Sequence, residues 1–77
     1  MSPRLPPVTG PGMVRALQKA GFVTVRISGS HHRLVHPSDA SRAATVPVHG
    51  AKTLKRGTLQ SILRQTGIVL EELLDLL

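Results

Sequence analysis

The chain has 77 residues, 40% of them apolar, which suffices for one small domain with a modest core but not for a deep, enclosed substrate cavity. It has no cysteine, which excludes disulfides and thiolate chemistry, and Phe22 is its only aromatic residue, which disfavours RNA-binding sheets that stack bases on rings. The net charge is +6: residues 1–66 hold all ten Lys and Arg and a single acid, a net +9, whereas residues 67–77 carry −3. A body this basic favours a polyanionic partner such as nucleic acid, with a generally basic surface as the plain alternative.

The sequence shows neither a secretory signal nor a membrane span. Its first residues contain no apolar segment of the kind found in signal peptides, and no later run approaches the length needed to cross a bilayer. We therefore expect no membrane association, and a cytoplasmic location fits.

The N-terminal part predicts an extended lead-in followed by a helix. Residues 1–8 contain three prolines, which fix φ and remove backbone donors, so we expect them to be extended. Thr9 is suited to cap a helix over about residues 10–20, where apolar side chains recur at helical spacing before a glycine. Because Gly10 and Gly12 lie in the opening turn, we expect the start of this helix to fray.

A β-hairpin is predicted next. Residues 22–28 alternate apolar and polar side chains, and Gly29-Ser30 fits a type II′ turn leading into a second strand over about residues 31–36. The turn fixes a register in which Ser28 faces His31, Ile27 faces His32, Arg26 faces Arg33 and Val25 faces Leu34. We expect one face, Val23, Val25, Ile27, His32 and Leu34, to pack against helices, and the other, Thr24, Arg26, Ser28, His31 and Arg33, to be open.

This register gives the two adjacent histidines different roles. His31 is expected on the open face beside Arg26 and Arg33, whereas His32 points toward the core. Histidine has an unperturbed pKa near neutrality, so an exposed His at a tight turn is suited to proton transfer. For His32 and His36 we expect packing or hydrogen-bonding roles.

The rest of the chain predicts one more strand and two helices. Residues 37–41 have turn chemistry, and a third strand follows over residues 42–48, where Pro47 indicates an edge position. A second helix carries an apolar stripe up to its stop at Gly67. Residues 68–77 predict a short third helix, with a leucine face that covers the core or, alternatively, binds a partner: Leu70, Leu73, Leu74 and Leu77.

Three cations, Lys52, Lys55 and Arg56, gather at the start of the predicted second helix. The helix dipole disfavours positive charge there, so this cluster suggests a phosphate partner, although a solvated surface is equally consistent. His49, in the segment Val46-Pro47-Val48-His49-Gly50, is either an assisting catalytic group or a structural cap of the third strand.

The residues available for catalysis disfavour a metal-dependent mechanism. Strand alternation places His31 on the opposite face from His32 and His36, which disfavours a shared zinc site. Two-metal phosphodiester cleavage needs converging carboxylates, and Asp39 is the only acid before residue 71. RNA carries its own nucleophile in the 2′-hydroxyl, so its cleavage without cofactor needs only proton transfer by a histidine and nearby cations. This mechanism predicts RNA rather than DNA as substrate.

Six short motifs occur along the chain in a distinctive order. They are Leu5-Pro6, Gly21-Phe22, Gly29-Ser30-His31-His32, Val46-Pro47-Val48-His49-Gly50, Lys55-Arg56-Gly57-Thr58-Leu59 and Ile62-Leu63-Arg64-Gln65-Thr66-Gly67. Together they resemble the HicA toxins of bacterial HicA/HicB toxin-antitoxin systems, over nearly the whole chain. Three features depart from the family pattern: Gly12 stands where a helix-favouring acid is usual, the connection from Asp39 to Ala44 is slightly long, and Val69 stands where a Ser or Thr cap is expected.

The resemblance implies a single domain over residues 1–77 with an α+β fold like the double-stranded-RNA-binding domain: α-β-β-β-α with a short C-terminal helix, and helices on one face of a three-stranded antiparallel sheet. It implies a metal-independent endoribonuclease, an mRNA interferase. The family's essential His follows a Gly-Ser pair, which maps it onto His31. Together with the charge pattern, this gives the leading hypothesis: His31 is the catalytic general acid or base, Gly29 and Ser30 shape the turn, and Arg26, Arg33, Lys52, Lys55 and Arg56 hold RNA.

The resemblance also implies a HicB-like antitoxin that covers the active surface, with operator DNA bound only indirectly through the antitoxin. Two alternatives stay open from the residues themselves. One is a non-catalytic RNA-binding module of the same fold, and the other is a subunit used mainly for protein contacts.

Overall fold

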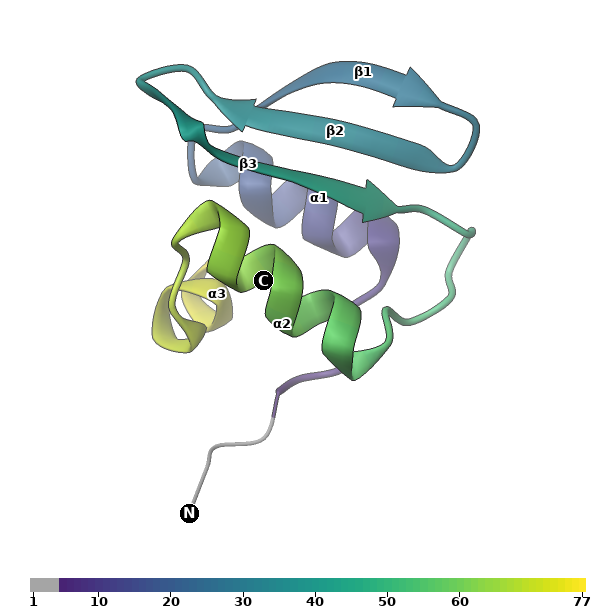
Figure 1. Cartoon of the computed structure of the whole chain (residues 1–77). Helices are drawn as coiled ribbons and strands as arrows, with labels where there is room; N and C mark the ends of the chain where they lie inside the picture. The colour runs from purple at the N-terminus through teal and green to yellow at the C-terminus, as the bar shows by residue number, and fades with distance from the viewer. Residues whose placement is uncertain (1–4) are drawn as a thin grey trace.

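The computed structural model describes residues 5–77. Its elements are helix α1 (Gly10–Lys19), strands β1 (Val23–Ser28), β2 (His31–His36) and β3 (Asp39–Pro47), and helices α2 (Arg56–Thr66) and α3 (Leu70–Leu76). The strands form one antiparallel sheet in the order β1-β2-β3, and the helices lie on one of its faces (Figure 1). The predicted α+β architecture is therefore confirmed.

The core fills the space between the sheet and the helices. Its sheet side comes from β2 and β3 alone, because β1 contributes no buried side chain. The buried apolar residues are Val8, Met13, Ala16, Leu17, Phe22, Leu34, Ala44, Val46, Leu59, Ile62, Ile68 and Leu73. Burial of these side chains supplies the main stabilisation of a chain that has no disulfide.

The start of α1 is capped by Thr9 and packs against the end of β3. The Thr9 side chain accepts a hydrogen bond from the Gly12 N–H at 3.0 Å, as predicted for the cap. Gly10 is buried, and a Cβ there would collide with the Pro47 carbonyl oxygen and lie 2.8 Å from the Cα of Val48. Gly10 permits close packing of α1 against the end of β3, and the expected fraying of this turn stays a prediction.

The lead-in is tied to the loop that precedes α2. Residues 1–4 of the predicted extended segment lie outside the described residues, and residues 5–8 form neither helix nor strand. The Leu54 N–H donates to the Val8 carbonyl oxygen at 2.8 Å, and Thr9 forms a β-bridge with Thr53. This contact fixes the loop that carries the cationic cluster.

The β1–β2 hairpin has the predicted turn. Gly29 has a φ of +58°, and no non-glycine residue among residues 5–77 has a positive φ, so only the first central residue of the turn is left-handed, as a type II′ turn requires. The pairs Ser28–His31, Ile27–His32 and Arg26–Arg33 lie opposite each other, which confirms the register next to the turn.

Farther from the turn, a β-bulge at Val25 changes the register. Leu34 pairs with Thr24, so the predicted pairing of Val25 with Leu34 was wrong. Thr24 shares the helix-facing side with Leu34, and its hydroxyl accepts a hydrogen bond from Gln18 Nε2 of α1 at 3.5 Å. An extra residue in one strand inverts the alternation beyond it, which the period-2 sequence pattern does not reveal.

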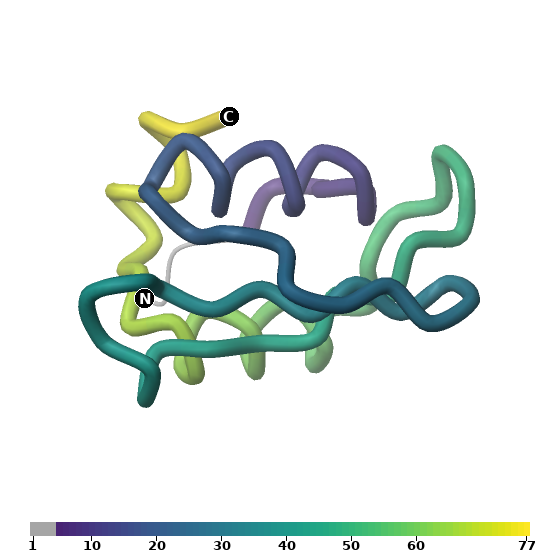
Figure 2. Tube along the Cα trace, turned by 90° about the horizontal axis from the view of Figure 1, so that it is seen from above, coloured from purple at the N-terminus to yellow at the C-terminus, as the bar shows by residue number. Residues whose placement is uncertain are grey.

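The apolar residues of β1 consequently lie outside the core, contrary to expectation. Val23 and Val25 are 47% and 57% exposed. Ile27 does lie opposite His32, but it is 61% exposed because the hairpin turn projects beyond the ends of α1 and α2 (Figure 2).

Strand β3 begins earlier than predicted. Residues 37–41 were expected to form a turn, but β3 starts at Asp39, and the register shifts between the pairs Val35–Ala43 and His36–Asp39. This irregularity accommodates the extra residues of the connection. Asp39 Oδ1 stabilises it by accepting hydrogen bonds from the N–H and the hydroxyl of Ser41 at 3.1 and 2.6 Å. The strand ends at Pro47 on the sheet edge, as predicted.

The two C-terminal helices follow the sequence closely. Gly67 ends α2 in the left-handed conformation, with a φ of +73°. In α3, Leu73 is fully buried and Leu76 packs against the core, whereas Leu74 and Leu77, which were expected on the same face, are about half exposed. Among residues 5–77 no helix has the length and apolar composition of a membrane span.

Candidate nucleic-acid interface

A shallow hollow of about 260 Å³ lies on the sheet face turned away from the helices. We call it the open-face hollow, and it is lined by Arg26, Ser28, His31, Arg33 and Thr45. All three strands contribute to it, so its geometry depends on the register of the whole sheet.

The register explains why these side chains meet. His31 lies between Ser28 and Pro47, and Arg33 lies between Arg26 and Thr45. Directly opposed residues share a face, and the next pair along β2 and β3, Leu34–Ala44, is buried in the core. The predicted placement of exposed His31 beside Arg26 and Arg33 is confirmed.

Two polar residues of the hollow were not among the predicted site residues. Arg33 Nη1 donates a hydrogen bond to Thr45 Oγ1 at 3.3 Å, so this arginine leans toward β3. The pairing of Thr45 with Arg33 depends on the β2–β3 register. This register could not be predicted from the sequence because the connection between the two strands is irregular. The sequence did place Ser28 on the correct face of the sheet. Its predicted position opposite His31 was the signal that could have identified it as a site residue.

The other two histidines of β2 face the helices. His32 is half-buried opposite Val46. The His36 ring packs edge-on against Phe22, with centroids 5.1 Å apart, and its Nδ1 accepts a hydrogen bond from the Ser38 N–H at 3.1 Å. These contacts agree with packing and hydrogen-bonding roles. Within residues 5–77, no three His, Asp or Glu side chains come together as metal ligands would.

A second hollow, of about 380 Å³, lies beside the start of α2. We call it the loop hollow, and among its lining residues are Pro47, His49, Lys52, Lys55 and Thr58. The exposed His49 is therefore in a different hollow from His31, although Pro47, the β3 partner of His31, lines this one. Arg56, the third predicted cation of this cluster, is the exposed first residue of α2 and lies outside the hollow's lining.

The loop carrying His49 is tied to the turn that carries His31. The Val48 N–H donates a hydrogen bond of 2.6 Å to the Ser30 carbonyl oxygen. This bond continues the pairing past the end of β3. Gly29 and Ser30 thus position the segment leading to His49 as well as the start of β2.

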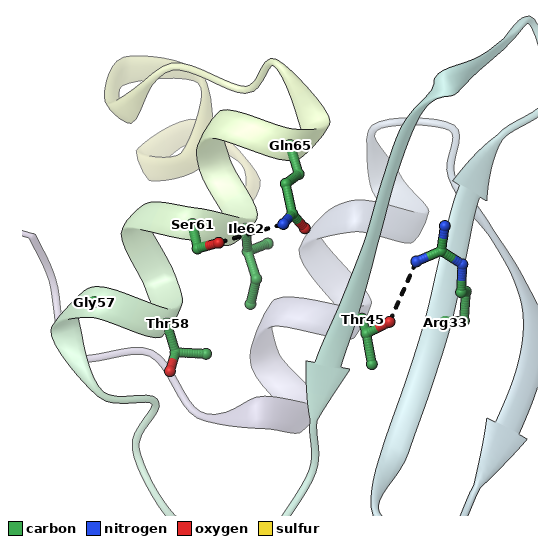
Figure 3. A pocket seen from close by; sticks show the side chains of 7 residues that line it. All are labelled: Arg33, Thr45, Gly57, Thr58, Ser61, Ile62 and Gln65. Carbon is green, nitrogen blue, oxygen red and sulfur yellow. Dashed lines mark hydrogen bonds between the residues drawn. The ribbon is translucent and has the colours of Figure 1, made fainter.

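A third depression, of about 430 Å³, separates β3 from α2, and we call it the β3–α2 groove (Figure 3). Arg33 and Thr45 line its sheet side, and α2 contributes Gly57, Thr58, Ser61, Ile62 and Gln65. Gln65 Nε2 donates a long hydrogen bond, 3.4 Å, to Ser61 Oγ. Sequence reasoning missed this groove; the signal was the spacing of Thr58, Ser61 and Gln65, which places polar groups along one side of a helix.

The β3–α2 groove joins the open-face hollow to the loop hollow, and none of the residues 5–77 that line the three depressions is acidic. Arg33 and Thr45 line both the open-face hollow and the groove, and Thr58 lines both the groove and the loop hollow. Asp39, the acid nearest in sequence to these lining residues, is at the β2–β3 turn, where hydrogen bonds from Ser41 lower its pKa. The joined surface suits a polyanion.

Comparison with known proteins places this geometry in a family. No curated protein matches the chain. A family profile described as the HicA toxin of bacterial toxin-antitoxin systems matches residues 11–68, which include the three strands, α2 and nearly all of α1. Since the match spans more than half of the chain and includes every residue that lines the three depressions, the chain belongs to the HicA toxin family, whose toxins are paired with HicB antitoxins.

Proposed function

We propose that the protein is the toxin of a type II toxin-antitoxin system and acts as a metal-independent endoribonuclease that cleaves mRNA. The observation that carries the proposal is the position of His31, an exposed imidazole in a hollow flanked by Arg26 and Arg33. Membership of the HicA toxin family supports it independently.

The proposed reaction uses the nucleophile that RNA supplies. The 2′ oxygen bonds to the adjacent phosphorus, the bond from phosphorus to the 5′ oxygen breaks, and the products are a 2′,3′-cyclic phosphate and a 5′-hydroxyl. One proton leaves the 2′-hydroxyl and one reaches the departing 5′ oxygen. His31 carries one of these two transfers, as general base or general acid, and water accepts or supplies the other proton. Arg26 and Arg33 stabilise the negative charge that grows on the phosphate oxygens.

The remaining cations are proposed to hold RNA beyond the reacting phosphate. Lys52 and Lys55 line the loop hollow and Arg56 begins α2, so phosphates leaving the open-face hollow toward α2 would meet positive charge. A HicB-like antitoxin would inhibit the toxin by covering the open-face hollow. Any contact of the pair with operator DNA would be made by the antitoxin.

The decisive experiment is RNA cleavage by purified protein in EDTA. We expect His31→Ala to reduce the rate by about 100- to 10,000-fold, the usual range for a general acid or base, while circular dichroism shows an unchanged fold. A substrate of the same sequence with 2′-deoxyribose should not be cut. Equal rates for the wild type and His31→Ala would remove His31 from the mechanism.

Cell toxicity distinguishes the proposal from a non-catalytic RNA-binding module of the same fold. Binding alone needs the cations but not the imidazole. A His31→Ala variant that still arrests growth and still binds RNA would therefore favour the binding module over the nuclease. His49→Ala, measured in parallel, tests whether the second exposed imidazole assists the reaction.

A further inference from the structure

We propose that the β3–α2 groove is an RNA subsite that holds the nucleotides next to the cleaved phosphate and reads them through Ser61 and Gln65. The inference rests on the proposed nuclease function and extends it by a specificity site on α2. The groove volume of about 430 Å³ falls within the roughly 300–1,000 Å³ typical of small-molecule binding sites.

The continuity of the surface determines where an RNA strand can go. A phosphate at His31 lies in the open-face hollow, whose outer rim toward β3 is formed by the bonded pair Arg33–Thr45. The same two residues form the sheet side of the groove. A strand leaving the reacting phosphate toward α2 therefore crosses this pair and enters the groove, and beyond Thr58 it reaches Lys52 and Lys55.

The groove differs in chemistry from the hollows on either side of it. Among residues 5–77, Arg33 is the only charged residue that lines it, and its other polar side chains are the hydroxyls of Thr45, Thr58 and Ser61 and the amide of Gln65. Hydroxyls and amides both donate and accept hydrogen bonds, so they suit ribose hydroxyls and base edges better than phosphates. The groove is therefore suited to selecting nucleotides, with affinity supplied by the cations on either side.

The polar side chains on α2 can bind a ligand at little cost. The hydrogen bond from Gln65 to Ser61 is 3.4 Å long and lies at the surface, so exchanging it for bonds to RNA loses little. Ser61 is half-buried and Gln65 is exposed, and both line the groove.

Gly57 supplies a separate argument. It lies in the first turn of α2, has no left-handed backbone, and would place an added Cβ in open space with no atom within 4 Å. Glycine weakens a helix relative to alanine, so packing within the chain gives no reason for it here. The absent side chain leaves room in the groove for a ligand backbone to approach the helix closely.

An RNA strand fits these observations better than a protein segment. In the described part of the chain, residues 5–77, no acidic residue lines the groove or either adjoining hollow, and Arg26, Arg33, Lys52 and Lys55 follow the surface from one end to the other. An RNA strand carries one negative charge per nucleotide and therefore matches this row of cations along its whole length.

The test uses Gln65→Ala with Gln60→Ala as a matched control, since both glutamines are exposed on α2 but only Gln65 lines the groove. With RNA substrates randomised around the cut, we expect Gln65→Ala to lower kcat/KM by about 3- to 10-fold, as for a lost neutral hydrogen bond, and to relax the sequence preference. Gln60→Ala should behave as the wild type.

Gly57→Ala provides a signature that a folding defect cannot imitate. We expect its melting temperature to rise by roughly 2 to 8 °C because the helix is strengthened, while its kcat/KM on RNA falls. Binding is measured separately by fluorescence anisotropy with a labelled single-stranded RNA of about 12 nucleotides in the His31→Ala background.

The outcomes separate the groove from the catalytic proposal. Cleavage that requires His31 but is unchanged in both Gly57→Ala and Gln65→Ala would overturn the subsite and leave the nuclease standing. RNA binding that weakens in Gln65→Ala and not in Gln60→Ala, without cleavage by the wild type, would support the subsite and overturn the nuclease. Unchanged RNA binding with reduced affinity for a purified HicB-like antitoxin would overturn the subsite by assigning the groove to a protein.

Discussion

Arg42 Nε donates a 2.6 Å hydrogen bond to the Thr66 carbonyl oxygen and so joins β3 to the last turn of α2. The carbonyl groups of a helix C-terminus lack partners within the helix and carry partial negative charge, which a guanidinium complements. The same guanidinium carbon lies 5.3 Å from the centroid of the Phe22 ring. Arg42 is therefore a structural cation, distinct from those that line the open-face hollow.

The first prediction concerns this contact. We expect Arg42→Ala to reduce the free energy of unfolding by about 1.5 to 3 kcal/mol, the range for a hydrogen bond to a charged group. Urea denaturation followed by circular dichroism measures it. Arg64→Ala, which removes an exposed arginine from α2, is the control and should change stability by less than about 0.5 kcal/mol. Equal effects of the two variants would contradict the structural role of Arg42.

A second prediction tests the packing of α1 against β3. Gly10→Ala forces a methyl group into the Pro47 carbonyl oxygen, and we expect it to cost about 1 to 3 kcal/mol, as overpacking does. Gly57→Ala adds the same methyl group in open space and should stabilise the protein slightly. The melting temperatures of the two variants should shift in opposite directions. A higher melting temperature for Gly10→Ala would contradict the close approach of Gly10 to the Pro47 carbonyl oxygen.

The third prediction separates the two adjacent histidines by stability. His32 is half-buried opposite Val46, whereas His31 is exposed, so His32→Ala should lower the melting temperature more than His31→Ala does. The reverse order would argue against the register next to the turn. Because His31 contributes little to packing, loss of cleavage in His31→Ala would report on chemistry rather than on folding.

A fourth prediction uses salt to count phosphate contacts. The logarithm of the RNA affinity should fall linearly with the logarithm of the salt concentration, with a slope of about 0.7 for each phosphate neutralised on a single strand. Lys52→Ala should therefore reduce the slope by about 0.7. Arg15→Ala, an exposed cation of α1 that lines none of the three depressions, should leave it unchanged. An unchanged slope in Lys52→Ala would remove that lysine from the interface.

The fifth prediction concerns acid and the β2–β3 turn. Hydrogen bonds from the hydroxyl and N–H of Ser41 hold the pKa of Asp39 below its ordinary value. A carboxyl whose pKa is lowered by folding stabilises the protein above its unfolded-state pKa, and this contribution is lost as the pH falls through the folded-state value. Ser41→Ala should raise the Asp39 pKa, as followed by NMR titration of the carboxyl group. No change would mean that the Ser41 hydroxyl makes no bond to Asp39 in solution.

Local signals in the sequence predicted much of the fold and the region around His31. Gly29-Ser30 specified the turn, and the turn specified which residues face His31 and Arg33 across the hairpin. Gly67 marked the end of α2, and Pro47 marked an edge strand. Each of these signals acts through a fixed φ, a missing donor or a short loop, so neighbouring residues sufficed to predict it.

The features that sequence reasoning missed depend on contacts between distant segments. The alternation of Val23, Val25 and Ile27 matches a half-buried strand, and no residue marks the bulge that moves Thr24 to the helix side. The role of Gly10 depends on Pro47, far along the chain. The groove forms only where β3 and α2 pack near each other. In the sequence alone, Thr58, Ser61 and Gln65 look like any solvent-exposed face of a helix.

The bulge at Val25 should make this protein resist association into fibres through its sheet edge. β1 is an outer strand, and a flat outer strand offers free backbone groups on which a second copy can align. The unpaired residue kinks this strand, and Arg26 beside it brings like charges together when two copies approach edge to edge. The exposed valines of β1 therefore lie along an edge that is poorly shaped for stacking.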